Sequence, residues 1–398
     1  MAKQNSTSKQ ENKTEVKAQP HINIKIIGIG GAGGNILTRM YKKKVEGVEF
    51  IALNTDMQAL HYTRADKKMN IGLNVTRGLG AGMDPEIGRR AIEENMTEIE
   101  DLLKGADLIF ITCGLGGGTG SGASPLVAEI AKKSGAIVVA VVTKPFFFEG
   151  GKRMEIANEA WNKLYNNVDA LITIYNDRIF NLIDKNTSVL EAFKQIDEIL
   201  RQGVQGIADL IYSPGLINLD FANLQTILTN TGEAIIGIGT ASGKDRAIKA
   251  AKAAIASPLL NLAVDGATRI LFNISGHRDL TLSEITDAAR LITETADSGA
   301  KIIFGASYDD ELKKGEVKIT VIAGGFGKSR QLQEDLFIDS PIFSALAKKE
   351  EVEEQKMPVD ESKNKKEAKV LVDDLSSSQE WNEQELEIPA FLKKNKNK

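Results

Sequence analysis

The sequence has few of the residues on which several classes of protein depend. Its single cysteine, Cys113, excludes a disulfide within the chain and fits a reducing compartment. Its three histidines are far apart in sequence, which argues against a zinc site or a Ser-His-Asp triad. No run of about 18 apolar residues is present, so we predict no membrane span. Residues 1–20 are polar and lack the apolar stretch of a secretory signal, so we expect a disordered tail on a cytoplasmic protein.

An excess of charge of either sign is also missing. The net charge is −4, so we expect no specific nucleic-acid partner. Apolar residues make up 42% of the chain and aromatic residues 6%, which is ordinary for a globular protein. A chain of 398 residues is long enough for two domains with cores of their own, plus extensions.

In the first half of the chain, apolar runs alternate with helical patterns. The predicted strands are Ile22–Gly28, Glu49–Leu53, Leu108–Thr112, Ala136–Val142 and Ala170–Ile174. Near-continuous apolar strands joined by helices predict a parallel sheet covered on both faces, so residues 21–187 are expected to form a doubly wound α/β domain. The clearest helix is predicted over Pro85–Lys104, with Asp84 as its N-cap and Gly105 just past its end.

Four further segments are predicted after this domain. A capping box, Ser188-Val189-Leu190-Glu191, begins a long central helix over residues 188–214. Alternation then restarts in a second, smaller α/β domain over 215–327. Residues 328–380 are rich in Glu, Lys, Asp and Ser, which predicts a disordered linker. Residues 381–398 contain an apolar, proline-containing island that we interpret as a partner-docking peptide.

The most informative segment is Gly116–Gly122, with five glycines and two small hydroxyl residues. It follows an apolar strand and precedes a helical stretch. Its backbone N–H groups can therefore converge on an anion beside the positive end of a helix. We predict a phosphate-binding loop here. Cys113, just before the loop, is interpreted as a small core residue.

A second glycine-rich loop leaves two interpretations open. Gly28–Gly33 contains G-x-G-x-x-G after a strand, and Asp56 follows the next strand, as in dinucleotide-binding dehydrogenases. A dinucleotide needs one pyrophosphate turn, however, and two glycine-rich loops suit a nucleoside triphosphate better. A standard P-loop is absent, because Gly327-Lys328-Ser329 lacks the required glycine at position 322, which is Ile322.

Gly116–Gly122 is also the tubulin signature, and the chain resembles the tubulin/FtsZ family of GTPases, in particular its bacterial cell-division branch. The resemblance spans Ile22 to Gly327 and resumes at the C-terminal peptide. Its further motifs are Asn54-Thr55-Asp56, Gly78-Leu79-Gly80-Ala81-Gly82, Val142-Thr143-Lys144-Pro145-Phe146, Phe148-Glu149-Gly150, Asn176-Asp177-Arg178, Gly215–Ala222 and Glu387–Leu392. It implies a homopolymer that hydrolyses GTP to GDP and phosphate with Mg²⁺, in the division ring at mid-cell on the inner face of the membrane.

The resemblance implies a set of nucleotide-binding residues. Backbone groups around the phosphates would come from Gly31, Ala32, Gly33, Gly34, Asn35, Gly117, Gly118, Thr119 and Gly120, and contacts with the γ-phosphate from Gly80, Ala81 and Gly82. Thr143, Glu149 and Arg153 match further nucleotide contacts. The metal ligands stay open, with Asp56 a candidate by its place alone.

For the base, the resemblance implies stacking on Phe193 and polar contacts from Asn35, Asn176 and Asp197. A carboxylate can accept two hydrogen bonds from the N1–H and 2-amino groups of guanine, which adenine does not offer. Plain helix packing for Phe193 and a solvated helix face for Asp197 are the alternatives. Glu198 stands where many relatives have Asp or Asn, so the contacts with the base could shift by one residue.

The resemblance further implies that a loop of the next subunit completes the site, with Asn218, Asp220 and Asn223 as its catalytic residues. Asn223 departs from the family, which usually has Asp there. An amide can orient water but cannot take a proton, so we expect slow hydrolysis. The alternatives are that Asp220 suffices, or that the protein is a GTP-gated scaffold with almost no hydrolysis.

A lesser departure is Tyr175, which replaces a common proline and is expected to matter little. At the C-terminus, the resemblance implies that membrane-tethering division adaptors and regulators bind the docking peptide. Its anchors would be Ile388, Pro389, Phe391 and Leu392. The lysines that follow could touch anionic lipid or acidic partners, or simply be solvated charge.

Overall fold

The structure is a computed structural model, and it describes residues 22–43, 47–181, 183–184, 186–212, 215–217, 219–256, 266–309 and 312–326. The predicted tail (1–20), linker (328–380) and docking peptide (381–398) therefore lie outside the described residues. Among the described residues, no helix combines the length and apolar character needed to cross a membrane.

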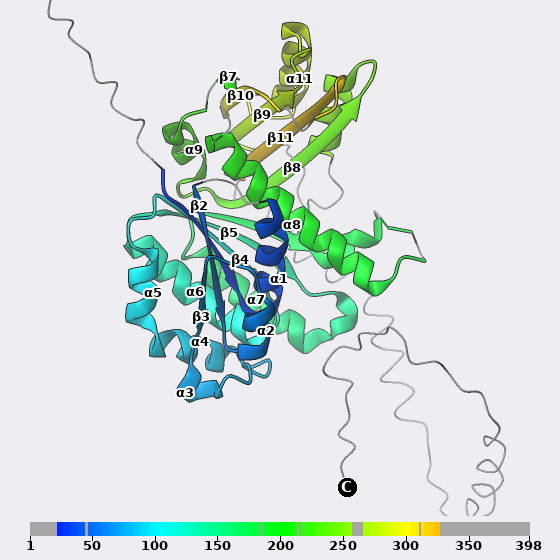
Figure 1. The fold of residues 1–398 in the computed structure, drawn as a ribbon. Coiled ribbons are helices and arrows are strands. Elements are labelled where there is room, and N and C mark those ends of the chain that lie inside the picture. The colour runs from blue at the N-terminus through cyan, green and yellow to red at the C-terminus, as the bar shows by residue number, and fades with distance from the viewer. Residues whose placement is uncertain are drawn as a thin grey trace, which may run out of the picture. The chain divides into compact units, whose positions relative to one another are not determined.

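The described strands form one eleven-stranded sheet in the order β3-β2-β1-β4-β5-β6-β8-β11-β9-β10-β7 (Figure 1). They are β1 (Ile24–Ile29), β2 (Val48–Asn54), β3 (Lys67–Asn70), β4 (Leu108–Gly114), β5 (Ile137–Lys144), β6 (Ala170–Tyr175), β7 (Gly215–Ile217), β8 (Gly232–Ser242), β9 (Arg269–Gly276), β10 (Lys301–Tyr308) and β11 (Glu316–Gly324). From β3 to β8 every neighbouring pair is parallel, whereas β11 runs antiparallel to both β8 and β9.

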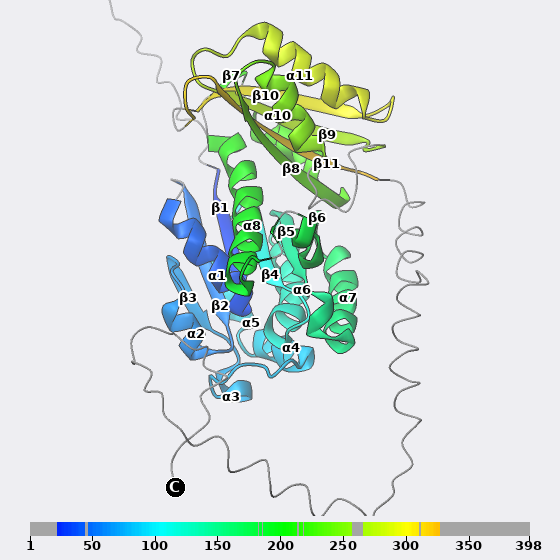
Figure 2. The ribbon, with the colours of Figure 1, turned by 90° about the vertical axis from the view of Figure 1, so that its right-hand side faces the viewer.

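Helices cover both faces of the parallel part of the sheet (Figures 1 and 2). They are α1 (Gly30–Met40), α2 (Met57–Tyr62), α3 (Leu73–Thr76), α4 (Pro85–Glu94), α5 (Met96–Leu103), α6 (Gly118–Lys133), α7 (Gly151–Tyr165), α8 (Val189–Tyr212), α9 (Phe221–Leu228), α10 (Arg246–Ile255) and α11 (Leu282–Glu294), with short 3₁₀ turns η1 (Tyr41–Lys43), η2 (Phe147–Glu149) and η3 (Asn176–Asn181). Side chains of α1 and α8 join one apolar core and those of α4 to α7 another, which also contains the fully buried Cys113. The predicted doubly wound parallel sheet and second α/β domain are confirmed.

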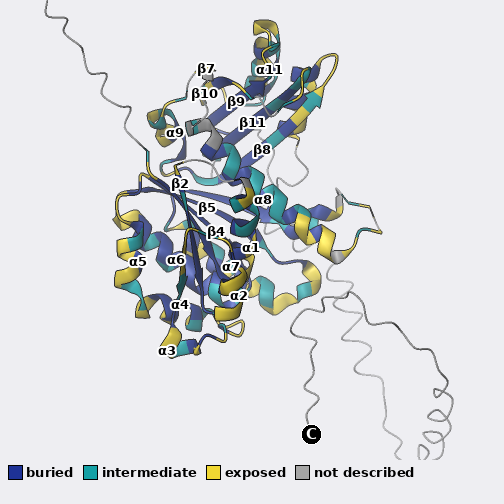
Figure 3. Cartoon of the chain, in the orientation of Figure 1, coloured by how far each residue is buried: buried dark blue, intermediate teal, exposed yellow. Residues whose placement is uncertain are grey.

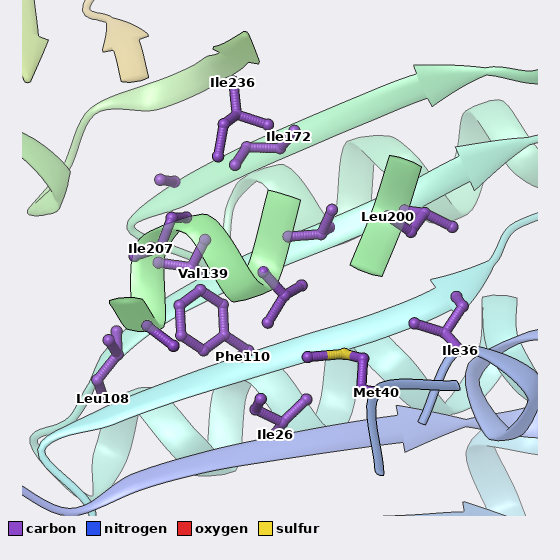
Figure 4. Close-up of a cluster of buried hydrophobic side chains, with 14 of the residues drawn as sticks. Ile26, Ile36, Met40, Leu108, Phe110, Val139, Ile172, Leu200, Ile207 and Ile236 are labelled. Atoms are coloured by element: carbon purple, nitrogen blue, oxygen red, sulfur yellow. The ribbon is translucent and has the colours of Figure 1, made fainter. Parts of the chain in front are cut away.

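The long helix α8 packs against both parts of the sheet. Leu200 and Ile207 lie among buried side chains of the parallel strands, including Phe110, and Ile236 of β8 joins the same cluster (Figure 4). At its start, the backbone N–H of Glu191 donates to Ser188 Oγ at 3.2 Å, which is the Ser188 half of the predicted capping box. Exposed residues gather at the start of α8, whereas its later described residues are intermediate or buried and the strands beneath are buried (Figure 3).

Two local predictions need correction. The helix expected over Pro85–Lys104 is interrupted at Asn95, whose backbone leaves the helical region with φ −112° and ψ 25°. The Asn95 side chain explains the break, because its Oδ1 accepts a hydrogen bond from Gly72 N at 2.9 Å. The predicted N-cap, Asp84, is correct, since its Oδ1 accepts from Glu86 N at 2.8 Å.

Strand β3 was not predicted, because its alternation is obscured by two lysines on an edge strand.

Gly122 allows α6 to pack closely on α4, and this leads to a stability prediction. A Cβ at Gly122 would lie 1.9 Å from the carbonyl oxygen of Pro85. We expect Gly122→Ala to lower the free energy of unfolding by about 3 kcal/mol, because backbone must move to relieve the overlap. Gly151→Ala is the control, since its Cβ would meet no atom within 4 Å. Chemical denaturation compares the two, and equal midpoints would contradict the packing argument.

Candidate functional site

The two glycine-rich loops meet at the carboxyl edge of the parallel sheet. Strands β1 and β4 are parallel neighbours with Ile29 opposite Cys113, so the loops that follow them start side by side. A Cβ on Gly30 would lie 3.3 Å from the backbone nitrogen of Gly120, and one on Gly33 would lie 2.6 Å from a carbonyl oxygen of β4. The close approach of the two loops therefore requires glycine at these positions.

Both loops lead directly into helices, α1 and α6, so two helix N-termini lie at this edge. Neither helix has an N-cap side chain that bonds its first N–H groups, and neither has an acidic residue in its first turn. A Cβ on Gly31 or Gly117 would meet no atom within 4 Å, which shows open space beside the loops. N–H donors, helix dipoles and space together can accommodate an anion such as a phosphate chain.

The segment Gly78–Gly82 lies against the signature loop. A Cβ on Gly118 would lie 2.8 Å from the Cβ of Ala81, and Ala81 itself is buried. The three glycines of this segment have positive φ angles of 76°, 90° and 54°. Only glycine adopts such a succession of left-handed conformations without strain, so the sequence here specifies a turn that reaches the first two loops.

Strand β5 and the turn after it bring Thr143, Glu149 and Arg153 to the same edge. Thr143 is buried, and its Oγ1 would lie 3.5 Å from a Cβ on Gly114. Glu149 accepts a hydrogen bond from Phe146 N at 2.9 Å and forms an ion pair with Arg153. The Arg153 side chain is 38% exposed, so its guanidinium can contact an anion while it stays paired with Glu149.

Asn176 follows β6 at this edge and carries an unusual unpaired group. The residue is buried, and its Oδ1 has no hydrogen-bond partner among the described residues. Buried amide oxygens nearly always accept a hydrogen bond, so the free Oδ1 suits a ligand that supplies a hydrogen-bond donor. Phe193 of α8 is 39% exposed and meets Phe146 edge to face at 5.3 Å. Phe193 is therefore packed on one side without being buried.

Asp197 of α8 does not lie on a solvated helix face. Its side chain is 15% exposed, and its Oδ2 lies 3.1 Å from Nε of Arg39 on α1. Burial raises the pKa of Asp197 from its usual value of 3.8 to about 6, although Arg39 opposes the shift. Arg39 was not predicted from the sequence. The available signal was that Arg39 lies four residues after the exposed Asn35, which places both on the same face of α1.

Glu198 is engaged within its own helix. Its Oε2 accepts from Nε of Arg201 at 2.8 Å, and its Oε1 accepts from Gln202 at 3.0 Å. The hydrogen bond with Arg201 lowers the pKa of Glu198. If Glu198 instead of Asp197 contacted the nucleotide base, these hydrogen bonds would break. The geometry therefore favours Asp197 as the residue that contacts the base.

Two of the predicted catalytic residues, Asp220 and Asn223, do not join this group within one chain. Asp220 is exposed and is the N-cap of α9, where its Oδ1 accepts from Asn223 N at 2.7 Å. Helix α9 leads into β8, whose first residue pairs with the first residue of β6, so α9 lies at the amino edge (Figure 1). The seven residues of β4 separate the two edges by roughly 20 Å. Asn218 lies outside the described residues.

Asp56 brings a carboxylate, a ligand that divalent metals accept, to the edge where β2 ends. Asp56 lies between Thr55 and α2, and its Oδ1 accepts from Ala59 N at 2.9 Å. Within the described ranges, no group of three or more His, Cys, Asp or Glu residues is placed to hold a metal ion. The carboxylate of Asp56 at this edge fits Mg²⁺, which is usually held by one or two carboxylates together with substrate phosphates.

Comparisons with known proteins agree on one family. The model of the Tubulin/FtsZ family, GTPase domain, matches residues 23–184, and that of the FtsZ family, C-terminal domain, matches residues 232–327. An empty FtsZ dimer from M. jannaschii is 44% identical over 76% of this chain and 88% of that chain, with a TM-score of 0.73. CetZ2 from Haloferax volcanii, a GTPγS-bound protofilament, is 23% identical over 79% of this chain and 96% of that chain, with a TM-score of 0.66. At that identity the second likeness shows the fold alone.

Proposed function

Because the chain belongs to the tubulin/FtsZ family, whose members are GTPases, we propose that it hydrolyses GTP to GDP and phosphate between head-to-tail subunits of a filament. The observation that carries this proposal is the separation of the two halves of the site in one chain. Glycine-rich loops occupy the carboxyl edge of the sheet, while Asp220 is exposed at the amino edge, roughly 20 Å away. A second subunit in a filament would bring these halves together.

The carboxyl edge would hold the nucleotide. The backbone N–H groups of Gly31–Asn35 and Gly117–Gly120 would surround the phosphates, with Arg153 as the nearby cation. The unpaired Oδ1 of Asn176 and the carboxylate of Asp197 are acceptors, and guanine offers donors that match them. Phe193 would stack on the base. This set of acceptors favours GTP over ATP.

The amino edge would complete the site of the neighbouring subunit. Asp220 would orient and activate the attacking water, and the Asn223 amide would help to position it without accepting a proton. Asp56 would hold Mg²⁺, which supplies charge neutralisation when bound. The missing second carboxylate predicts slow turnover. It also favours the alternative of a GTP-gated scaffold with almost no hydrolysis.

The cellular role follows from the same family resemblance. We infer a cytoplasmic protein that assembles the division ring at the inner face of the membrane at mid-cell. Division adaptors would bind Ile388, Pro389, Phe391 and Leu392, which lie outside the described residues. The support for this role is the peptide's similarity to the docking tail of the family.

Phosphate release from GTP, measured against protein concentration together with sedimentation of the same samples, tests the proposal. We expect pelleting with GTP above a threshold concentration, and slow phosphate release that begins at the same threshold. GDP is the control and should give no pellet. Pelleting without phosphate release would select the scaffold alternative, whereas hydrolysis below the threshold would contradict a site shared between subunits.

A further inference from the structure

Thr55 and Thr119 form a direct contact between two loops at the carboxyl edge. Thr55 follows β2 and is fully buried, and its Oγ1 lies 2.7 Å from Oγ1 of Thr119. Thr119 belongs to the first turn of α6 and is partly exposed. One hydroxyl of the pair is therefore sealed from water, while the other lies beside the proposed phosphate site.

The backbone of Thr55 is held in place by a different loop. Its carbonyl oxygen accepts a hydrogen bond from Gly80 N at 3.3 Å. The residue after it, Asp56, forms a bridge with Leu79. Thr55 cannot shift without disturbing the segment Gly78–Gly82, so its hydroxyl is presented to Thr119 in a fixed position.

The chemistry of a bound phosphate sets the direction of this hydrogen bond. A hydroxyl has one hydrogen to donate, and phosphate oxygens only accept. When Thr119 donates its hydrogen to a phosphate, its oxygen can still accept one from Thr55. The buried Thr55 hydroxyl then donates to Thr119, and water cannot reach Thr55 to take over this role. The two hydroxyls form a short chain that polarises toward the anion.

We propose that Thr55 is a positioning residue that orients the Thr119 hydroxyl toward a phosphate of the bound nucleotide. The inference rests on the proposed function, since it requires a phosphate beside Thr119. Thr55 itself makes no contact with the ligand and acts only through Thr119.

Three variants of the full chain test the inference by titration with GDP and GTP below the assembly threshold. We expect Thr55→Val to weaken binding of both nucleotides by about tenfold, because a charge-assisted hydrogen bond loses its supporting donor. Thr55→Ser keeps the hydroxyl and should stay within about twofold of the wild type. The matched control is Thr112→Val, since Thr112 is also fully buried, lies near the same edge, and has an Oγ1 without a hydrogen-bond partner among the described residues. It should bind as the wild type does.

A double-mutant cycle separates positioning from packing. In a Thr119→Val background, Thr55→Val should cost nothing further, because its effect passes through the Thr119 hydroxyl. A full tenfold cost in that background, or equal losses in Thr55→Ser and Thr55→Val, would overturn the inference. Should Thr55→Val not fold, Thr55→Ala lacks the same hydroxyl and carries the same expectation. Failure of the wild type and Thr112→Val to bind GTP would instead reject the proposed function.

Discussion

Replacing Asn223 with aspartate is expected to raise GTP hydrolysis by the assembled protein by about tenfold to 100-fold. Asn223 is the third residue of α9, and its backbone N–H donates to Oδ1 of Asp220 at 2.7 Å. The substitution keeps this bond and adds a carboxylate that can take a proton from water. A negative charge in the first turn of a helix is favourable, so the fold should be undisturbed. Phosphate release per pelleted subunit measures the effect.

Gln225→Glu is the matched control for this prediction. Gln225 is exposed on the same helix, so the variant adds the same charge without changing the proposed catalytic loop. Its turnover should equal that of the wild type. If Asn223→Asp also matched the wild type, Asp220 alone would suffice for hydrolysis and the slow-turnover hypothesis would be wrong. If Gln225→Glu were as fast as Asn223→Asp, the cause would be charge at the subunit interface.

The affinity for GDP is expected to fall about tenfold between pH 7.5 and pH 5.0. Burial raises the pKa of Asp197 to about 6, so roughly a tenth of this carboxyl group is ionised at pH 5 in the free protein. Guanine requires the ionised form, which accepts both of its donors, so affinity rises as the pH rises through 6 and is flat above about 7. The stability of the free protein depends on pH in the opposite direction. The pKa of Asp197 in the folded protein exceeds its usual value of 3.8, so the contribution of Asp197 to the free energy of unfolding falls as the pH rises from about 4 to about 6.

Two variants identify the group responsible. Asp197→Asn should lose the pH dependence and bind GDP about 100-fold more weakly at pH 7.5, because an amide cannot accept both guanine hydrogens. Glu198→Gln removes the neighbouring carboxylate, which is bonded to Arg201 and Gln202, and should bind GDP within about twofold of the wild type. Titration of each variant with GDP at both pH values decides the matter. Loss of binding in Glu198→Gln alone would place the base contact one residue later.

The predictions that were confirmed concern features that depend on residues close to one another in sequence. The five strands expected in the first domain are present with no end shifted by more than two residues, because a continuous apolar run between helical patterns is a short-range signal. Asp84 and Ser188 cap their helices for the same reason, since a cap bonds to N–H groups two or three residues away. The prediction of one helix over Pro85–Lys104 was wrong at Asn95, whose side chain bonds to Gly72, a residue distant in sequence.

The sequence by itself determined the doubly wound fold, the two glycine-rich loops and the family. Apolar periodicity specifies buried faces, and glycine is the residue that close backbone approach requires. The tertiary structure alone decided which side chains face one another across the site. It paired Asp197 with Arg39, bound Glu198 to its own helix, and joined Thr55 to Thr119. These contacts depend on the angle and register at which separate helices and strands pack. Residue spacing along the chain does not encode that geometry.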